Sequence, residues 1–169
     1  MKFGPVKQKR NKWYVAIGLV VGFLIISNLT TVELKRTACL GICPVYTLRV
    51  WGNGLVTYHG ELGLVEGDRV SFISPVQAWL LFGSTLAYGL THFDPIYANE
   101  NTDYEGSQTC LNVGPLTKCV LVRSDARSTL AVQPDSLREL NRMIDEVTNS
   151  VQWTGTIDQR LDKYVRPKP

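Results

Sequence analysis

The feature that most constrains this chain is an apolar run of twenty residues, 13–32, that carries no charge. The twelve residues before the run carry five basic side chains and no acidic one. As an α-helix, twenty residues would extend about 30 Å, which is close to the hydrocarbon thickness of a bilayer. Basic residues beside such a helix stay on the cytoplasmic side. The pattern therefore predicts a transmembrane anchor at 13–32 with a cytoplasmic basic tail at 1–12.

A cleaved signal peptide is the alternative interpretation of the same run. Cleavage requires small residues at the −3 and −1 positions, and the residues from Ile25 to Arg36 offer no good match. Trp13 and Tyr14 lie at the basic edge of the run, where interfacial aromatic residues belong. We therefore expect an uncleaved signal anchor. It implies a single-pass protein of the bacterial inner membrane, with a cytoplasmic N-terminus and a periplasmic C-terminal domain.

The formal net charge of +3 is unevenly distributed along the chain. From Glu33 onward, 13 basic side chains face 15 acidic ones, so this part carries a net charge of −2. A nucleic-acid-binding protein would carry its basic side chains on the folded surface. The charge pattern thus argues against nucleic acid as a partner and favours the lipid bilayer.

Gly18 and Gly22 form a GxxxG motif within the predicted anchor. Two glycines four residues apart lie on one helix face and let a second helix approach closely. We expect this face to pack against other integral membrane subunits. The alternative is that both glycines are ordinary members of a membrane helix, because GxxxG alone is a weak motif.

Residues 33–153 read as one α+β domain, followed by a polar C-terminal tail at 154–169. Runs rich in β-branched and aromatic residues predict strands at 45–51, 55–62, 67–72, 108–113 and 117–123, and the loosely alternating run at 32–38 is a further strand candidate. The turn signal Gly52-Asn53-Gly54 makes residues 45–62 a predicted hairpin. The fold class expected is a small antiparallel sheet packed with two helices, after the N-terminal transmembrane helix.

The first of these two helices begins with a capping box in the sequence Ser74-Pro75-Val76-Gln77, and the second covers about residues 135–151. Helical spacing predicts that the first helix packs through Val76, Trp79, Leu80, Gly83, Leu86, Ala87 and Leu90. Leu81, Phe82 and Tyr88 lie off this face. Because no charged residue accompanies them, we expect these three side chains to contact a partner protein.

Four cysteines fall into two closely spaced pairs, Cys39 with Cys43 and Cys110 with Cys119. An even number in an oxidising compartment predicts disulfides. If Gly114-Pro115 is a two-residue turn, Cys110 lies opposite Cys119 on the paired strand. Two alternatives remain open at the first pair, whose spacing also fits a zinc site or a thiol-redox centre.

The residues around the first pair follow the pattern R-T-x-C-x-G-x-C-P-x-Y and then G-x-G-x-V-x-Y-x-G. Its positions are held by Cys39, Gly41, Cys43, Pro44, Tyr46, Gly52, Gly54, Val56, Tyr58 and Gly60. On these residues the chain resembles an uncharacterised bacterial envelope domain family, over about residues 33–155. The resemblance implies an extracytoplasmic α+β domain and no particular activity. The acidic loop at 94–107 and the second cysteine pair depart from the pattern.

The sequence contains no motif that would assign a catalytic, metal or cofactor site. There is no nucleophile elbow, phosphate-binding loop or dinucleotide fingerprint, and His59 and His92 are isolated. We therefore expect a non-enzymatic accessory subunit that stabilises a larger membrane complex, with respiratory and photosynthetic assemblies as possible hosts. One alternative is a stand-alone membrane-anchored periplasmic binding or sensing module, whose small-molecule ligand the sequence does not identify. The other is a thiol-redox protein that uses Cys39 and Cys43.

Overall fold

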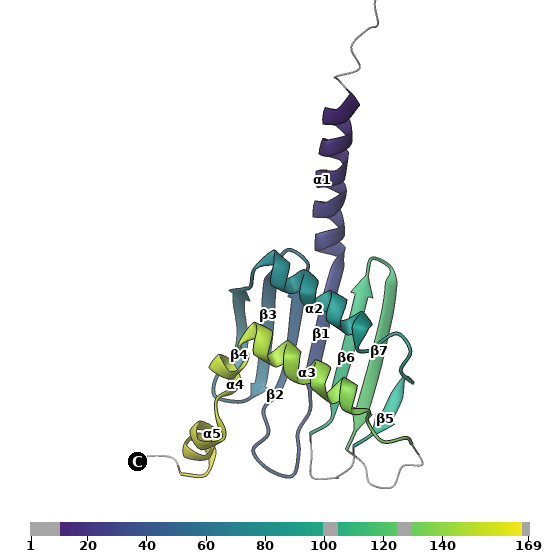
Figure 1. The fold of residues 1–169 in the computed structure, drawn as a ribbon. Coiled ribbons are helices and arrows are strands. Elements are labelled where there is room, and N and C mark those ends of the chain that lie inside the picture. Colours follow the sequence, from purple (N-terminus) through teal and green to yellow (C-terminus); the bar gives the residue numbers. More distant parts are fainter. Residues whose placement is uncertain (1–10, 100–104, 125–129, 167–169) are drawn as a thin grey trace, which may run out of the picture.

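The computed structural model describes residues 11–99, 105–124 and 130–166 and is organised around one sheet (Figure 1). The sheet has seven strands in the order β4-β3-β2-β1-β6-β7-β5. The strands are β1 (Thr30–Arg36), β2 (Val45–Trp51), β3 (Leu55–Leu62), β4 (Gly67–Phe72), β5 (Ile96–Ala98), β6 (Ser107–Val113) and β7 (Leu116–Arg123). In the described ranges the helices are α1 (Asn11–Leu29), α2 (Pro75–Ala87), α3 (Asp135–Thr148), α4 (Val151–Thr154) and α5 (Ile157–Tyr164).

Neighbouring strands of the sheet are antiparallel except β5, which pairs with β7 in parallel. The predicted hairpin at 45–62 forms as β2 and β3. Its turn requires glycine at position 54, where φ is +89° and a Cβ atom would lie 2.2 Å from the carbonyl oxygen of Ile73. The sheet is larger than the small antiparallel sheet expected, because strand β5 forms inside the stretch that was read as a loop.

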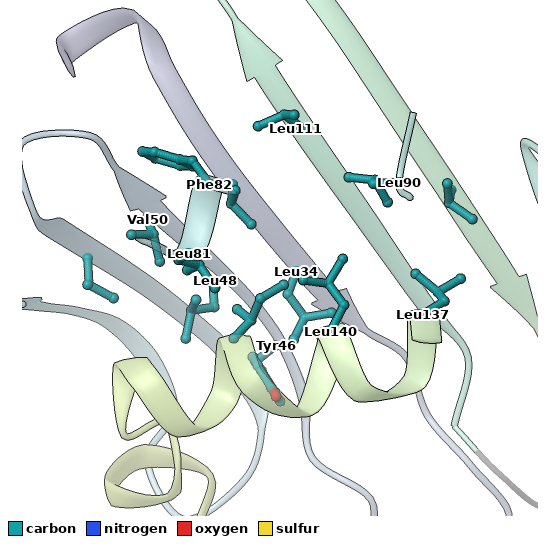
Figure 2. Packing of buried hydrophobic residues seen from close by; sticks show 14 of the residues in the cluster. Leu34, Tyr46, Leu48, Val50, Leu81, Phe82, Leu90, Leu111, Leu137 and Leu140 are labelled. Carbon is teal, nitrogen blue, oxygen red and sulfur yellow. The ribbon is translucent and has the colours of Figure 1, made fainter. Parts of the chain in front are cut away.

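The hydrophobic core lies between the sheet and helices α2 and α3, which cover the same face (Figure 1). In β2, alternate residues point to this face, so Tyr46, Leu48 and Val50 are buried while Arg49 is exposed. Leu137 and Leu140 of α3 meet them from the other side, and neither has accessible surface (Figure 2). Fully burying a leucine stabilises the folded state by about 1.5–3 kcal/mol, so this layer holds α3 on the sheet.

Helix α2 begins where predicted, but it packs through a different face. The Ser74 hydroxyl accepts a hydrogen bond from the Gln77 backbone N–H, and the Gln77 side chain bonds back to the Ser74 N–H, so the capping box is formed. The predicted partner contact is wrong for Leu81 and Phe82, which are 1% and 5% exposed within the core. Tyr88 also packs partly buried against the core.

The residues of α2 that were expected in the core lie largely on its outside. Val76, Leu80 and Leu86 are 69%, 66% and 56% exposed. Apolar residues surround this helix, so spacing alone could not identify the inner face. Thr85 helps decide the orientation, because its hydroxyl donates to the Phe82 carbonyl at 2.7 Å and can be buried without an unpaired polar group.

The predicted transmembrane anchor at 13–32 is wrong. Helix α1 ends at Leu29, and residues 30–32 belong to strand β1, as the β-branched side chains of Thr30, Thr31 and Val32 favour. Within the described part of the chain, no helix has both the length and the apolar character needed to cross a membrane. This finding also overturns the inner-membrane, single-pass location that was inferred from the anchor. Most of the basic tail at 1–12 lies outside the described residues.

The polar C-terminal tail folds back onto the domain as helix α5. A second capping box, between Thr156 and Gln159, starts the helix. At its other end, the Tyr164 hydroxyl donates to the Gly63 carbonyl at 2.6 Å, and Lys163 lies 2.7 Å from a Glu66 carboxylate oxygen. The tail therefore closes one side of the domain beside the loop between β3 and β4.

Candidate functional site

Helix α1 projects away from the sheet (Figure 1), and its described large apolar side chains are exposed. Ten of them are between 48% and 75% exposed: Trp13, Tyr14, Val15, Ile17, Leu19, Val20, Val21, Ile25, Ile26 and Leu29. The helix carries no charged residue between Trp13 and Leu29. Soluble monomers rarely expose apolar patches larger than a few hundred Å², so this surface is a candidate interaction site.

The base of α1 is fixed to the sheet by hydrogen bonds. The backbone N–H of Gly114 donates to the Leu29 carbonyl at 2.9 Å, and that of Gly52 donates to the Thr30 carbonyl at 3.0 Å. The Thr30 hydroxyl donates to the Ile26 carbonyl at 3.0 Å. Position 52 must be glycine, because a Cβ atom there would lie 2.7 Å from the backbone oxygen of Ser27. The helix thus continues directly into β1 and is hydrogen-bonded to the sheet at its base.

Gly18 and Gly22 lie on the projecting part of α1. A Cβ atom added at either position would meet nothing within 4 Å. Neither glycine is therefore required by the packing of this chain, and both leave the helix backbone open to a neighbour.

The outer face of α2, formed by Val76, Leu80 and Leu86, is a second exposed apolar surface. It lies at the same end of the sheet as the base of α1 (Figure 1). Several side chains assigned to the core, Val76, Leu80 and Leu86, are outside, whereas Leu90 and Trp79 pack in or against the core as predicted. Two of the side chains assigned to a partner are inside.

Both cysteine pairs stand at disulfide distance, as predicted. Cys110 of β6 lies opposite Cys119 of β7 with a Cα–Cα distance of 4.1 Å, and Val113 lies opposite Leu116 across the turn. This pair is on the face of the sheet away from α2 and α3, because its strand neighbour Glu33 alternates with buried residues of β1. Cys39 and Cys43 close the segment between β1 and β2, with a Cα–Cα distance of 5.7 Å.

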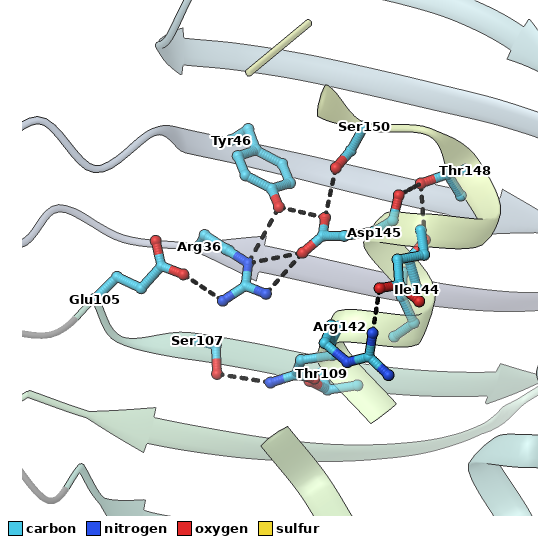
Figure 3. Close-up of polar contacts among 12 residues, drawn as sticks. Arg36, Tyr46, Glu105, Ser107, Thr109, Arg142, Ile144, Asp145, Thr148 and Ser150 are labelled. Atoms are coloured by element: carbon cyan, nitrogen blue, oxygen red, sulfur yellow. Dashed lines mark hydrogen bonds and ion pairs between the residues drawn. The ribbon is translucent and has the colours of Figure 1, made fainter. Parts of the chain in front are cut away.

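At the opposite end of β1 from the helix, a charged network joins the sheet to α3 (Figure 3). Arg36, the last residue of β1, lies 2.7 Å through Nη2 from an Asp145 carboxylate oxygen and also forms an ion pair with Glu105. The Tyr46 hydroxyl donates to the other Asp145 oxygen. The Ser150 hydroxyl donates to that same oxygen at 2.8 Å. These groups come from four separate segments of the chain.

Electrostatics explains why this network can be buried. Burial disfavours the charged form of Arg36, but Asp145, Tyr46 and Glu105 together outweigh burial and raise the pKa of the guanidinium. Burial, together with the Asp145 carboxylate, raises the pKa of the Tyr46 hydroxyl. Burial also raises the pKa of the Glu105 carboxyl, and Arg36 partly offsets this effect. At neutral pH the network therefore contains a charged arginine and a neutral tyrosine.

Sequence reasoning did not find this network, because Arg36 and Asp145 are 109 residues apart. A signal was present on α3, where Asn141 and Asp145 are four residues apart beside the apolar stripe. Asn141 is 2% exposed, and its amide donates to the Ser107 hydroxyl at 3.0 Å. Two polar residues at helical spacing next to a core face indicate a polar contact across that face.

The fold and its surfaces define a class of protein: a disulfide-bonded α+β domain that carries a projecting apolar helix. Comparison with known families shows which family the domain belongs to. Residues 30–148 match the family described as a domain of unknown function, DUF6438, and the chain belongs to that family. The predicted membership of an uncharacterised domain family is thereby confirmed. The match begins at β1, so α1 lies outside it. No match was found among curated proteins.

Proposed function

We propose that this chain is a non-enzymatic accessory subunit of a larger protein complex, joined to its partner through helix α1. The observation that supports this function is the exposure of the uncharged apolar surface of α1 on a helix whose base is bonded to the sheet. Nineteen helical residues extend about 28 Å, enough to pack along several turns of another helix. Burying this surface against a partner is favourable, since apolar burial contributes about 25 cal/mol per Å².

The chemistry of α1 specifies the kind of partner. Without charged residues between Trp13 and Leu29, the helix offers no ion pair and matches another apolar helix. Gly18 and Gly22 sit on one face, and small residues at a helix contact shorten the distance between the axes below the usual 8–10 Å. We therefore assign the partner's contact to an uncharged α-helix that packs along the glycine face.

The outer face of α2 supplies a second contact in this proposal. Val76 and Leu80 are one helical turn apart and both exposed. Once α1 is bound, contact through α2 becomes intramolecular and gains effective concentration. The two surfaces together orient the domain on its partner, whereas α1 alone would fix only one axis.

The test compares which proteins co-purify with the tagged full-length chain and with a variant that combines Gly18→Ile and Gly22→Ile. Both are expressed at the native level. The wild type should migrate with one partner in constant stoichiometry, and the double variant should lose it while its domain unfolds at the wild-type temperature. The matched control is Ala16→Ile with Val20→Ile, which adds bulk about 200° around the helix and should keep the partner. Retention of the partner by the glycine variant, or migration of the wild type alone, would contradict the proposal.

A further inference from the structure

Beside the charged network lies an open cleft of about 760 Å³. Its walls come from β1, β2, β6, one face of α3 and the C-terminal segment that contains α4 and α5. This volume is in the range of small-molecule sites, which are usually 300–1,000 Å³. Two of its lining side chains, Gln133 and Arg160, have polar groups that make no hydrogen bond within the described residues.

Gln133 is a largely buried residue whose side-chain amide makes no hydrogen bond to the described residues. The residue is only 8% exposed and lines the cleft. Its backbone N–H donates to the Ala98 carbonyl at 2.9 Å, which fixes the residue in place. In the ranges that the structure describes, no hydrogen bond is made by its side-chain amide. The amide atoms keep some accessible surface on the cleft side, so they are available to a molecule that enters the cleft.

Arg160 brings a positive charge that no carboxylate pairs with in the described part of the chain. Its Nε donates to the Ile42 carbonyl at 2.9 Å, and its Nη1 donates to the Thr154 and Gly155 carbonyls. These neutral acceptors hold the guanidinium rigidly and leave both N–H groups of Nη2 without a protein acceptor in the described residues. A fixed guanidinium with free donors is a strong site for an oxyanion.

The other arginines of the cleft differ from Arg160. Arg36 is paired with Asp145 and Glu105, Arg142 with Glu139 and Glu146, and Arg138 with Asp135. These paired arginines form the wall of the cleft. Arg160 differs because, among the described residues, no carboxylate lies at ion-pair distance from it, although its charge also lowers the pKa of the Glu105 carboxyl.

We propose that this cleft binds a small organic anion. A carboxylate or phosphate group of the ligand binds Nη2 of Arg160, and a polar group elsewhere on the ligand pairs with the Gln133 amide. The charged network of Arg36, Asp145 and Tyr46 holds the adjoining wall in place and makes no contact that the ligand must replace. The site lies at the opposite end of β1 from α1, so it is independent of the proposed partner contact.

The test is a titration of the ¹⁵N-labelled full-length chain with inorganic phosphate and with acetate at constant ionic strength, followed by NMR. The Gln133 side-chain amide and the Arg160 Nε–H signals should shift saturably with at least one probe. Saturation with phosphate alone assigns a phosphate ligand, with acetate alone a carboxylate. Chloride at the same ionic strength should shift neither signal. No saturable shift with either probe would overturn the proposal.

Three variants separate a specific site from general charge attraction. Arg160→Gln should weaken binding about tenfold or more, which corresponds to the loss of a charged hydrogen bond. Arg166→Gln removes an exposed positive charge from the same C-terminal segment and should leave the affinity unchanged. Gln133→Glu keeps the shape of the side chain but repels an anion, so it tests the site even if Arg160→Gln fails to fold. Equal weakening by the Arg166 and Arg160 variants, or wild-type affinity of Gln133→Glu, would overturn the proposal.

Discussion

The two ends of strand β1 have opposite chemistry. At the Thr30 end, α1 and the outer face of α2 expose apolar side chains that carry no charge. At the Arg36 end, about 20 Å away for seven extended residues, an arginine and an aspartate are largely buried. Hydropathy alone would predict that the apolar side chains are buried and the charged side chains exposed. The difference shows that burial here depends on the available partners. Charged groups are buried where they pair with each other, and apolar groups stay exposed where the described residues do not cover them.

The largest expected effect is at the charged end. Asp145→Ala should destabilise the domain by about 3–5 kcal/mol, because it leaves the Arg36 guanidinium and the Tyr46 hydroxyl without their shared acceptor. Chemical denaturation measures the change. The matched control is Glu139→Ala on the same helix, which removes an exposed carboxylate and should have a much smaller effect. If both variants lost the same stability, the network would not hold α3 on the sheet.

At the apolar end, two adjacent leucines of α2 test which face is buried. Leu81→Ala should cost about 2–5 kcal/mol through lost packing and a cavity. Leu80→Ala removes an exposed side chain and should change the free energy of unfolding by less than about 0.5 kcal/mol. The same denaturation experiment compares the two variants. If Leu80→Ala cost more stability than Leu81→Ala, the buried face of α2 would be the one expected from the sequence.

The two disulfides allow the charged end of the sheet to be compared with its middle. Replacing Cys110 and Cys119 with alanine should cost about 2–3 kcal/mol, because their bond closes a loop of about ten residues in the unfolded chain. Replacing Cys39 and Cys43 should cost less, since that loop is about half as long. Thermal unfolding without reductant measures both variants. A larger loss of stability on replacing Cys39 and Cys43 would mean that this disulfide shapes the cleft wall in the folded state, beyond its effect on the unfolded chain.

The smallest effect concerns alkaline pH and the buried Tyr58. Burial, with a contribution from Tyr164, raises the pKa of Tyr58 from 10.0 to about 12. Below pH 10 the phenol is neutral in both states, so its contribution to stability is fully present. Between about pH 10 and 12 the unfolded chain ionises first, and stability falls.

Tyr58→Phe should therefore make the decline in stability over that pH range shallower, as measured by urea denaturation. Tyr14→Phe, which removes a hydroxyl from an exposed side chain, is the matched control. An unchanged slope in Tyr58→Phe would show that this phenol titrates normally in the folded domain.

Local sequence signals predicted much of the fold. The glycine turn between β2 and β3, the capping box at Ser74 and the register of Cys110 with Cys119 each depend on residues close together in the chain. Strand β5 was missed because its three residues pair with β7 in parallel and carry too short a pattern to stand out from a loop. The inner face of α2 was also missed, since apolar residues occur on every side of that helix.

The transmembrane interpretation failed at the boundary between helix and strand. The uncharged run from 13 to 32 looks continuous in composition, but its last three residues are β-branched and pair with β6. The charged network and the cleft could not be predicted, because Arg36, Asp145 and Arg160 meet only after the sheet and the C-terminal helices are assembled. Spacing rules describe neighbours along one element, whereas these contacts join separate elements.

The junction between α1 and β1 also determines how the domain would respond to mechanical force. No loop separates Leu29 from Thr30, so tension on the helix passes directly into the central strand. That strand is held by six residue pairs to β2 and seven to β6. Hydrogen bonds in antiparallel sheets run perpendicular to the strands, so a pull along β1 loads both ladders in shear, and many bonds resist it together. A domain pulled through α1 would thus resist extraction far better than one pulled through an edge strand, whose bonds can break one at a time.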